Sequence, residues 1–173
     1  MTSSFATGIS ALDLTPKWGA SAAAQIIVTA HTALTGVTMS ASPLIDGAGH
    51  IISADHISFF REASIDFANI SVTAHGNLEV PQHSPSGDSR IPDPLIPFLD
   101  PYTTPARAVG APFNVAAGLN QPVWVDVFIP KDTLAGVYQA VITVSLSGQS
   151  PVAVPLTLTV WEWVLAQGCF MIS

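Results

Sequence analysis

The sequence has few charged residues and very few basic ones. Only 10% of its 173 residues are charged, while 49% are hydrophobic; an average soluble domain carries about 25% charged residues. Five Lys and Arg against twelve Asp and Glu give a formal net charge of −7. The clustered cations that bind a phosphate backbone are missing, so we exclude nucleic acid as a partner. A surface this poor in charge is typical of secreted β proteins and of subunits that pack against others, and it predicts an extracellular or cell-surface location.

Cysteine and long apolar segments are almost absent as well. The single cysteine, Cys169, cannot form an internal disulfide and carries no predicted function. No apolar run reaches the roughly 18 residues of a membrane-spanning helix, so no membrane span is predicted. Residues 1–10 also lack the basic and apolar regions of a signal peptide, so an exported form would have lost its leader.

Patterns that indicate catalysis or metal binding are missing too. There is no Gly-x-Ser-x-Gly nucleophile motif, and the five histidines show no His-x-x-x-His spacing. Asp88, Asp93 and Asp100 offer hard oxygens of the kind that calcium prefers, but not at EF-hand spacing, so turn capping is the favoured role. We predict a protein that is not an enzyme, with no catalytic residue, cofactor or metal site.

What the sequence does contain is a two-residue alternation of apolar side chains. Fourteen prolines and twelve glycines break the chain into short pieces, and no long stretch keeps a helical period. Apolar residues alternate clearly in three strands at 123–129, 138–146 and 152–160, which are joined by turns. Further strands are predicted at 22–31, 36–41, 51–52 and 56–62, and at 63–74 with a bulge near Asn69.

Residues 75–120 have a different character. Their many prolines argue against regular ladder strands, and apolar residues such as Ile91 and Phe98 predict that the segment packs on the rest of the fold. We predict an all-β fold, an immunoglobulin-like antiparallel β-sandwich with a long proline-rich excursion over residues 75–120. Residues 1–165 form this single domain and residues 166–173 a C-terminal tail.

The segment from Pro130 to Tyr138 resembles the tyrosine corner of immunoglobulin-like sandwiches. In that motif a glycine, here Gly136, permits a tight entry into the strand. The tyrosine, here Tyr138, turns its hydroxyl back to upstream backbone. Both residues are therefore expected to be structural.

Four stretches together resemble one family. They are residues 36–67, Arg90-Ile-Pro-Asp-Pro-Leu-Ile-Pro97, Asn120-Gln-Pro-Val-Trp-Val-Asp-Val127 with residues 130–138, and Val154-Pro-Leu-Thr-Leu-Thr-Val-Trp-Glu-Trp163. They look like the N-terminal β-sandwich domain of multidomain glycoside hydrolases similar to family 123 and related proteins of unknown function. The resemblance covers most of residues 19–165. It implies a sandwich that precedes a catalytic barrel.

The chain departs from that family at two points. Gly19-Ala20 stands where a Gly-Glu pair is usual, and the tail after Trp163 does not look like the start of a barrel, so we expect the catalytic barrel to be absent. Hydrolysis of a glycosidic bond needs two carboxyl groups about 5–10 Å apart, whereas the acids here are scattered singly. The resemblance therefore implies the module and not the hydrolase activity.

Trp124, Trp161 and Trp163 are the candidate interaction residues. Trp161 and Trp163 share one face of the last strand, which would need a cover in the absence of a barrel. Residues 2–14 have enough apolar character to add a strand to a neighbour. We expect a non-catalytic structural or interaction module that self-associates in a homo-oligomeric or filamentous extracellular assembly. The alternative is a carbohydrate-binding accessory module of a glycoside hydrolase, with glycans or the missing barrel domain as its partner.

Overall fold

The computed structural model describes residues 5–7, 21–66 and 90–162. These residues are almost entirely strands, with one short 3₁₀ helix. The elements are β1 (Phe5–Thr7), β2 (Ser21–Ala30), β3 (Leu34–Ala41), β4 (Leu44–Asp46), β5 (Ile51–Ile52), η1 (Ala54–His56), β6 (Ile57–Asp66), β7 (Arg90–Pro97), β8 (Leu99–Asp100), β9 (Arg107–Ala108), β10 (Phe113–Val115), β11 (Asn120–Phe128), β12 (Gly136–Ser145) and β13 (Val152–Val160). No helix in this part of the chain is long and apolar enough to cross a membrane.

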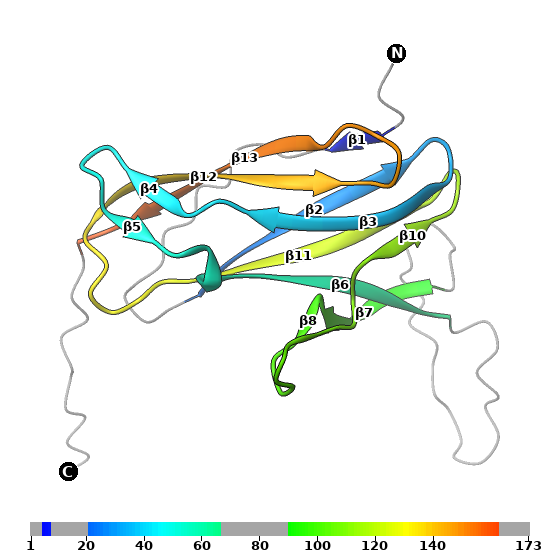
Figure 1. The fold of residues 1–173 in the computed structure, drawn as a ribbon, viewed down its shortest axis with the longest axis horizontal. Coiled ribbons are helices and arrows are strands. Elements are labelled where there is room, and N and C mark those ends of the chain that lie inside the picture. The colour runs from blue at the N-terminus through cyan, green and yellow to red at the C-terminus, as the bar shows by residue number, and fades with distance from the viewer. Residues whose placement is uncertain (1–4, 8–20, 67–89, 163–173) are drawn as a thin grey trace, which may run out of the picture.

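The strands form two main sheets that lie on top of each other (Figure 1). The five-stranded sheet has the order β1-β2-β11-β6-β7. In the six-stranded sheet β12 pairs with β13 on one side and with β3 and β4 on the other, and β10 and β5 extend it. Every pairing is antiparallel. This confirms the predicted all-β antiparallel sandwich.

The core lies between the sheets and follows the alternation in the sequence. On β11 the residues Val123, Val125 and Val127 are buried, while the positions between them face outward. The same alternation buries one side of the next two strands: Tyr138, Ala140, Ile142 and Val144 on β12, and Val154, Leu156 and Leu158 on β13. A one-residue slip of β13 against β12 would turn the buried side chains of β13 to solvent, so burial fixes the register. The three predicted C-terminal strands are confirmed.

β3 and β4 act as one long strand that is broken at Ser42 and Pro43. β3 pairs with β12 at 142–145, and β4 pairs with it at Tyr138 and Gln139. Ser42 bridges the break, because its N–H donates to the Val141 carbonyl (2.9 Å) and its hydroxyl accepts from the Val141 N–H (3.0 Å). The sheet thereby stays continuous where proline cannot donate a ladder hydrogen bond.

The expectation that prolines prevent ladder strands between residues 75 and 120 is wrong for residues 90–97. β7 contains Pro92, Pro94 and Pro97, yet it pairs with β6 along its length. β7 lies at the edge of the five-stranded sheet, so only one side of it needs hydrogen bonds. Prolines are tolerated in such a strand, and the sequence alone did not reveal that this segment is an edge.

Part of the N-terminal segment pairs within the chain. Phe5–Thr7 pairs with the chain's own β2 at 28–30 and lies at the edge of the five-stranded sheet, and addition of residues 2–14 to a neighbour stays a prediction. β6 runs to Asp66, and its pairing with β7 is irregular between Glu62 and Ser64. The bulge predicted near Asn69 lies outside the described residues, as do Trp163 and Cys169.

Candidate functional site

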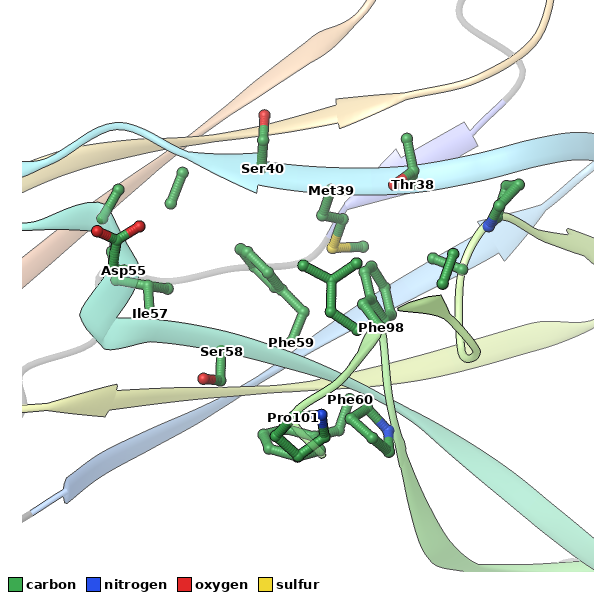
Figure 2. A pocket seen from close by; sticks show the side chains of 17 residues that line it. Thr38, Met39, Ser40, Asp55, Ile57, Ser58, Phe59, Phe60, Phe98 and Pro101 are labelled. Atoms are coloured by element: carbon green, nitrogen blue, oxygen red, sulfur yellow. The ribbon is translucent and has the colours of Figure 1, made fainter. Parts of the chain in front are cut away.

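A groove of about 560 Å³ lies along one open side of the sandwich. It runs between β3, at 38–41, and the layer formed by β6 and the segment that follows β7 (Figure 2). The rings of Phe59 and Phe98 lie 5.7 Å apart and face Met39. Phe60 and Pro101 lie on the other side of β6. The groove is therefore mainly apolar.

The groove opens because, in the part of the chain that the structure describes, β3 has no neighbouring strand on one side of its C-terminal half. β10 covers β3 only at 34–37, and β5 pairs with β4. Ser42 donates its N–H to β12. Successive residues of an antiparallel strand direct their backbone groups to opposite sides. Met39 and Ala41 therefore direct their N–H and C=O groups away from β12 and into the groove. Asp55 is the one carboxylate in the lining, and Ser53 holds it in the η1 turn. The groove thus has an apolar wall and a free strand edge but no acid pair.

Tyr138 has the geometry expected of a tyrosine corner. Its side chain is only 1% exposed, and its hydroxyl donates to the Leu134 carbonyl, 2.9 Å away and four residues upstream. Burial, with a smaller contribution from the charge of Asp46, raises the pKa of Tyr138 above its ordinary value of 10.0. The hydroxyl therefore stays protonated and remains a donor. Gly136 lies beside Asp46, where a Cβ would stand 3.3 Å from Oδ2 of that carboxylate.

Asp46 organises the turn between β4 and β5. Its Oδ1 accepts from the backbone N–H groups of Ala48 (3.0 Å) and His50 (2.7 Å), and its Oδ2 lies 2.7 Å from His50 Nδ1. The hydrogen bond from the His50 side chain is the main reason why the pKa of Asp46 is lowered; partial desolvation opposes it, and the two backbone donors add to it. This pair was not predicted, although Asp46 and His50 flank a Gly-x-Gly turn in the sequence.

The structure separates the predicted tryptophan residues. Trp161 follows β13 at the end of the six-stranded sheet and is 51% exposed. Trp124 lies on the outward side of β11, in the middle of the five-stranded sheet, and is half-buried. The two belong to different sheets, so they do not form one surface.

Trp124 is surrounded by polar and aromatic groups from the neighbouring strands. Gln25 of β2 and Phe60 of β6 are its cross-strand partners. Gln25 Nε2 donates to Glu62 Oε1 (2.7 Å), and Glu62 is only 7% exposed although it lies toward the outer face. The surface therefore combines an indole, an amide and a carboxylate, a combination that sequence spacing did not predict because three strands supply it.

The described histidines and acids form no metal site. No group of three or more His, Cys, Asp or Glu side chains comes together in residues 5–7, 21–66 and 90–162. His50 pairs with Asp46, and the ring of His56 packs 5.6 Å from that of Phe128. Asp100 caps its own turn by accepting from the Tyr102 N–H at 2.9 Å.

The fold has counterparts of known structure. A family 123 glycoside hydrolase from Clostridium perfringens, whose structure was solved for the details of glycolipid glycan hydrolysis, aligns over 91% of this chain with TM-score 0.62 and 17% identity. The chain spans only 24% of that enzyme. The PapD-like domain 7 of human CEP192 (TM-score 0.42, 10% identity, 95% of this chain and 92% of that one) matches more weakly. So does the sporulation control protein Spo0M from Bacillus subtilis (0.45, 8%, 92% and 50%).

Sequence comparison agrees with the structural match. A search of curated proteins gives no match. The model of the glycoside hydrolase 123 N-terminal domain, however, matches residues 12–146. This span includes all strands from β2 to β12, and it confirms the resemblance seen in the sequence. The chain therefore belongs to the family of glycoside hydrolase 123 N-terminal domains.

Proposed function

We propose that this chain is a non-catalytic accessory module of a glycoside hydrolase, and that it docks on another folded protein through the outer face of the six-stranded sheet. The observation that carries the proposal is the complete lack of charge on the outward positions of β12 and β13. These positions are Val137, Gln139, Val141, Thr143 and Ser145, and Ala153, Pro155, Thr157 and Thr159. Depletion of charge marks the centre of protein–protein interfaces.

The shape of this face supports docking as well. Val141 is paired with Pro155 across the strands, and Gln139 with Ile45 of β4. Together with Pro43 they line a shallow hollow of about 340 Å³. Val137 and Val141 expose 52% and 42% of their surface, so covering them would remove apolar area from water.

In a longer hydrolase the natural cover for this face is the rest of the enzyme, because the related Clostridium perfringens hydrolase has about three quarters of its chain outside the matched part. For the isolated chain we propose that a second copy covers it, in a closed homo-oligomer. Among the described residues β13 pairs only with β12, and the chemistry of its outer edge favours a closed oligomer over a filament. Val141 makes its backbone hydrogen bonds with Ser42, on the side away from β13, so Val141 and Pro155 form a pair without hydrogen bonds between them. The backbone nitrogen of Pro155 therefore points to the outer edge of β13. Because proline has no N–H, it interrupts the addition of another strand at that edge.

Size-exclusion chromatography with light scattering tests the docking face. We expect the wild-type chain to form a dimer or small oligomer and Val141→Glu to be monomeric, because a charge in an apolar contact is costly. Ser64→Glu adds the same charge to an exposed position of β6 in the other sheet and is the matched control. A wild-type chain that remains monomeric at high concentration would exclude self-association. The extracellular or cell-surface location remains a prediction.

The absence of catalysis has its own test. Asp55 is the one carboxylate in the lining of the groove, so the groove lacks the pair of acids that hydrolysis of a glycosidic bond needs. Incubation of the chain with a glycolipid glycan should release no sugar. Release that disappears in Asp55→Asn would assign the groove a hydrolytic role and overturn the proposal.

A further inference from the structure

The outer faces of the two sheets differ in chemistry. The face formed by β12 and β13 is uncharged and has no aromatic residue on its outward positions. On the five-stranded sheet β11 lies between β2 and β6 (Figure 1), and its outward residues include Trp124, Asp126 and Phe128. This second face offers an aromatic surface next to strong hydrogen-bond acceptors.

Trp124 and Asp126 have unused hydrogen-bonding groups. Within residues 5–7, 21–66 and 90–162 neither side chain makes a hydrogen bond or an ion pair. The indole N–H of Trp124 is not one of the buried polar atoms that lack a partner, so it reaches solvent. The two residues stand two positions apart on β11, which places them about 7 Å from each other on the same side. Gln25 Nε2 is engaged by Glu62, which leaves the amide oxygen of Gln25 as a further acceptor beside Trp124.

We propose that this surface, made by Trp124, Asp126, Gln25 and Phe60, is a binding site for a neutral oligosaccharide. The indole presents a flat apolar surface on which the C–H face of a pyranose ring stacks. The carboxylate of Asp126 and the amide oxygen of Gln25 accept hydrogen bonds from hydroxyl groups at the edge of the ring, while the indole N–H donates to a sugar oxygen. The inference goes beyond the proposed docking function and uses the opposite sheet.

Charge defines the class of sugar. Glu62 and Asp126 are the charged residues on the outward positions of β2, β11 and residues 58–62 of β6. Arg61 lies on an inward position of β6, opposite the buried Val123, so no Lys or Arg occupies an outward position there. A carboxylated sugar would meet two like charges with no cation to balance them, and repulsion would weaken it. Neutral hexoses and N-acetylhexosamines carry hydroxyl and amide groups without that penalty.

The test begins with an array of neutral hexose and N-acetylhexosamine oligosaccharides, with oligogalacturonates as the acidic counterpart. We expect at least one neutral oligosaccharide to bind with a Kd below about 10 mM and to shift the NMR signal of the Trp124 indole N–H. Trp124→Ala should weaken binding at least about tenfold and Asp126→Ala roughly fivefold. Asp126→Ala removes an unpartnered surface group, so it keeps the proposal testable if Trp124→Ala folds poorly.

Trp161→Ala is the matched control, because Trp161 is an exposed tryptophan on the other sheet. It should bind the same oligosaccharide with unchanged affinity. The proposal is overturned by an array without any neutral ligand, by acidic oligosaccharides that bind as well as neutral ones, or by binding that survives both Trp124→Ala and Asp126→Ala. None of these results depends on whether the chain self-associates through β12 and β13.

Discussion

Gln25 and Glu62 are joined across the five-stranded sheet by a hydrogen bond of 2.7 Å that passes over β11, the strand between them. Glu62 is 7% exposed, so the bond satisfies a carboxylate that water hardly reaches. The amide therefore links two strands that are not neighbours, and it does so beside Trp124.

Removal of this amide should destabilise the fold. We expect Gln25→Ala to lower the free energy of unfolding by about 1–2 kcal/mol, because a buried carboxylate oxygen loses its donor. Denaturant unfolding measures the change. Gln139→Ala on β12 is the control, since the Gln139 side chain is exposed and makes no hydrogen bond among the described residues. It should stay within about 0.5 kcal/mol of wild type. Equal losses in both variants would contradict the assigned role of the bond.

Two variants separate the contributions of Tyr138 to the free energy of unfolding, one from its hydrogen bond and one from its packing. Tyr138→Phe removes only the hydroxyl that donates to Leu134 and should cost about 1 kcal/mol. Tyr138→Ala also empties a buried site and should cost roughly 3–5 kcal/mol. Equilibrium unfolding of both, with Val137→Ala as an exposed neighbour, gives the two values. A neutral Tyr138→Phe would mean that the hydroxyl gains as much from water as from the carbonyl.

Two glycines are required for different reasons. Gly36 has a positive φ of +65°, and a Cβ there would collide with the hydroxyl of Ser147. Gly110 does not have a positive φ, but a Cβ there would stand 2.6 Å from the carbonyl oxygens of Ile96 and Pro97. The positive φ strains an alanine at Gly36, and backbone oxygens cannot move aside cheaply at Gly110. We therefore expect each alanine variant to lose roughly 1–3 kcal/mol in thermal or denaturant unfolding. Gly47→Ala has open space around the new Cβ and should be close to neutral. A Gly47→Ala variant that loses as much stability as the other two would contradict collision and positive φ as the causes.

Asp46 makes stability depend on acid pH. Its pKa in the folded chain is below the ordinary value of 3.8, chiefly through the hydrogen bond with the His50 side chain. Its contribution to the free energy of unfolding is therefore fully present above pH 3.8 and is lost as the pH falls through the lowered folded-state pKa. The difference in stability between wild type and Asp46→Asn should be largest near neutral pH and shrink toward about pH 2.

His50→Ala is the companion variant for Asp46. Loss of the histidine should bring the pKa of Asp46 back toward 3.8, although the backbone N–H groups of residues 48 and 50 still donate to it. NMR titration of the Asp46 carboxyl carbon follows this shift directly. An unchanged titration would show that the backbone donors, and not the ring, hold the charge.

Much of the fold was predictable because it depends on local pattern. The alternation of Val123, Val125 and Val127 with polar or aromatic neighbours identified β11 and its buried side, and the same reasoning placed β12 and β13. Pairing of β7 was missed, because the tolerance of a strand for proline depends on whether a neighbour lies on one side or two. That number is a property of the sheet and cannot be read from the strand.

The candidate sites were less predictable. Trp124 was singled out by its residue type, but its surroundings come from Gln25 on β2 and Phe60 on β6, which are far apart in the sequence. The groove beside Met39 exists because β10 and β5 leave part of β3 uncovered. Neither arrangement leaves a spacing signal, since each needs the strand order of the finished sandwich.

The sequence by itself determined the low charge, the two-residue period and the tyrosine corner, and with them an all-β sandwich of the glycoside hydrolase 123 N-terminal family. These features depend on side chains at fixed short spacing, and burial of one side of each strand then selects the register. Only the tertiary structure decided which outward positions share a surface, because strand order brings distant residues to one face. It thereby placed Trp124 and Trp161 on different sheets and gave the two outer faces their different chemistry.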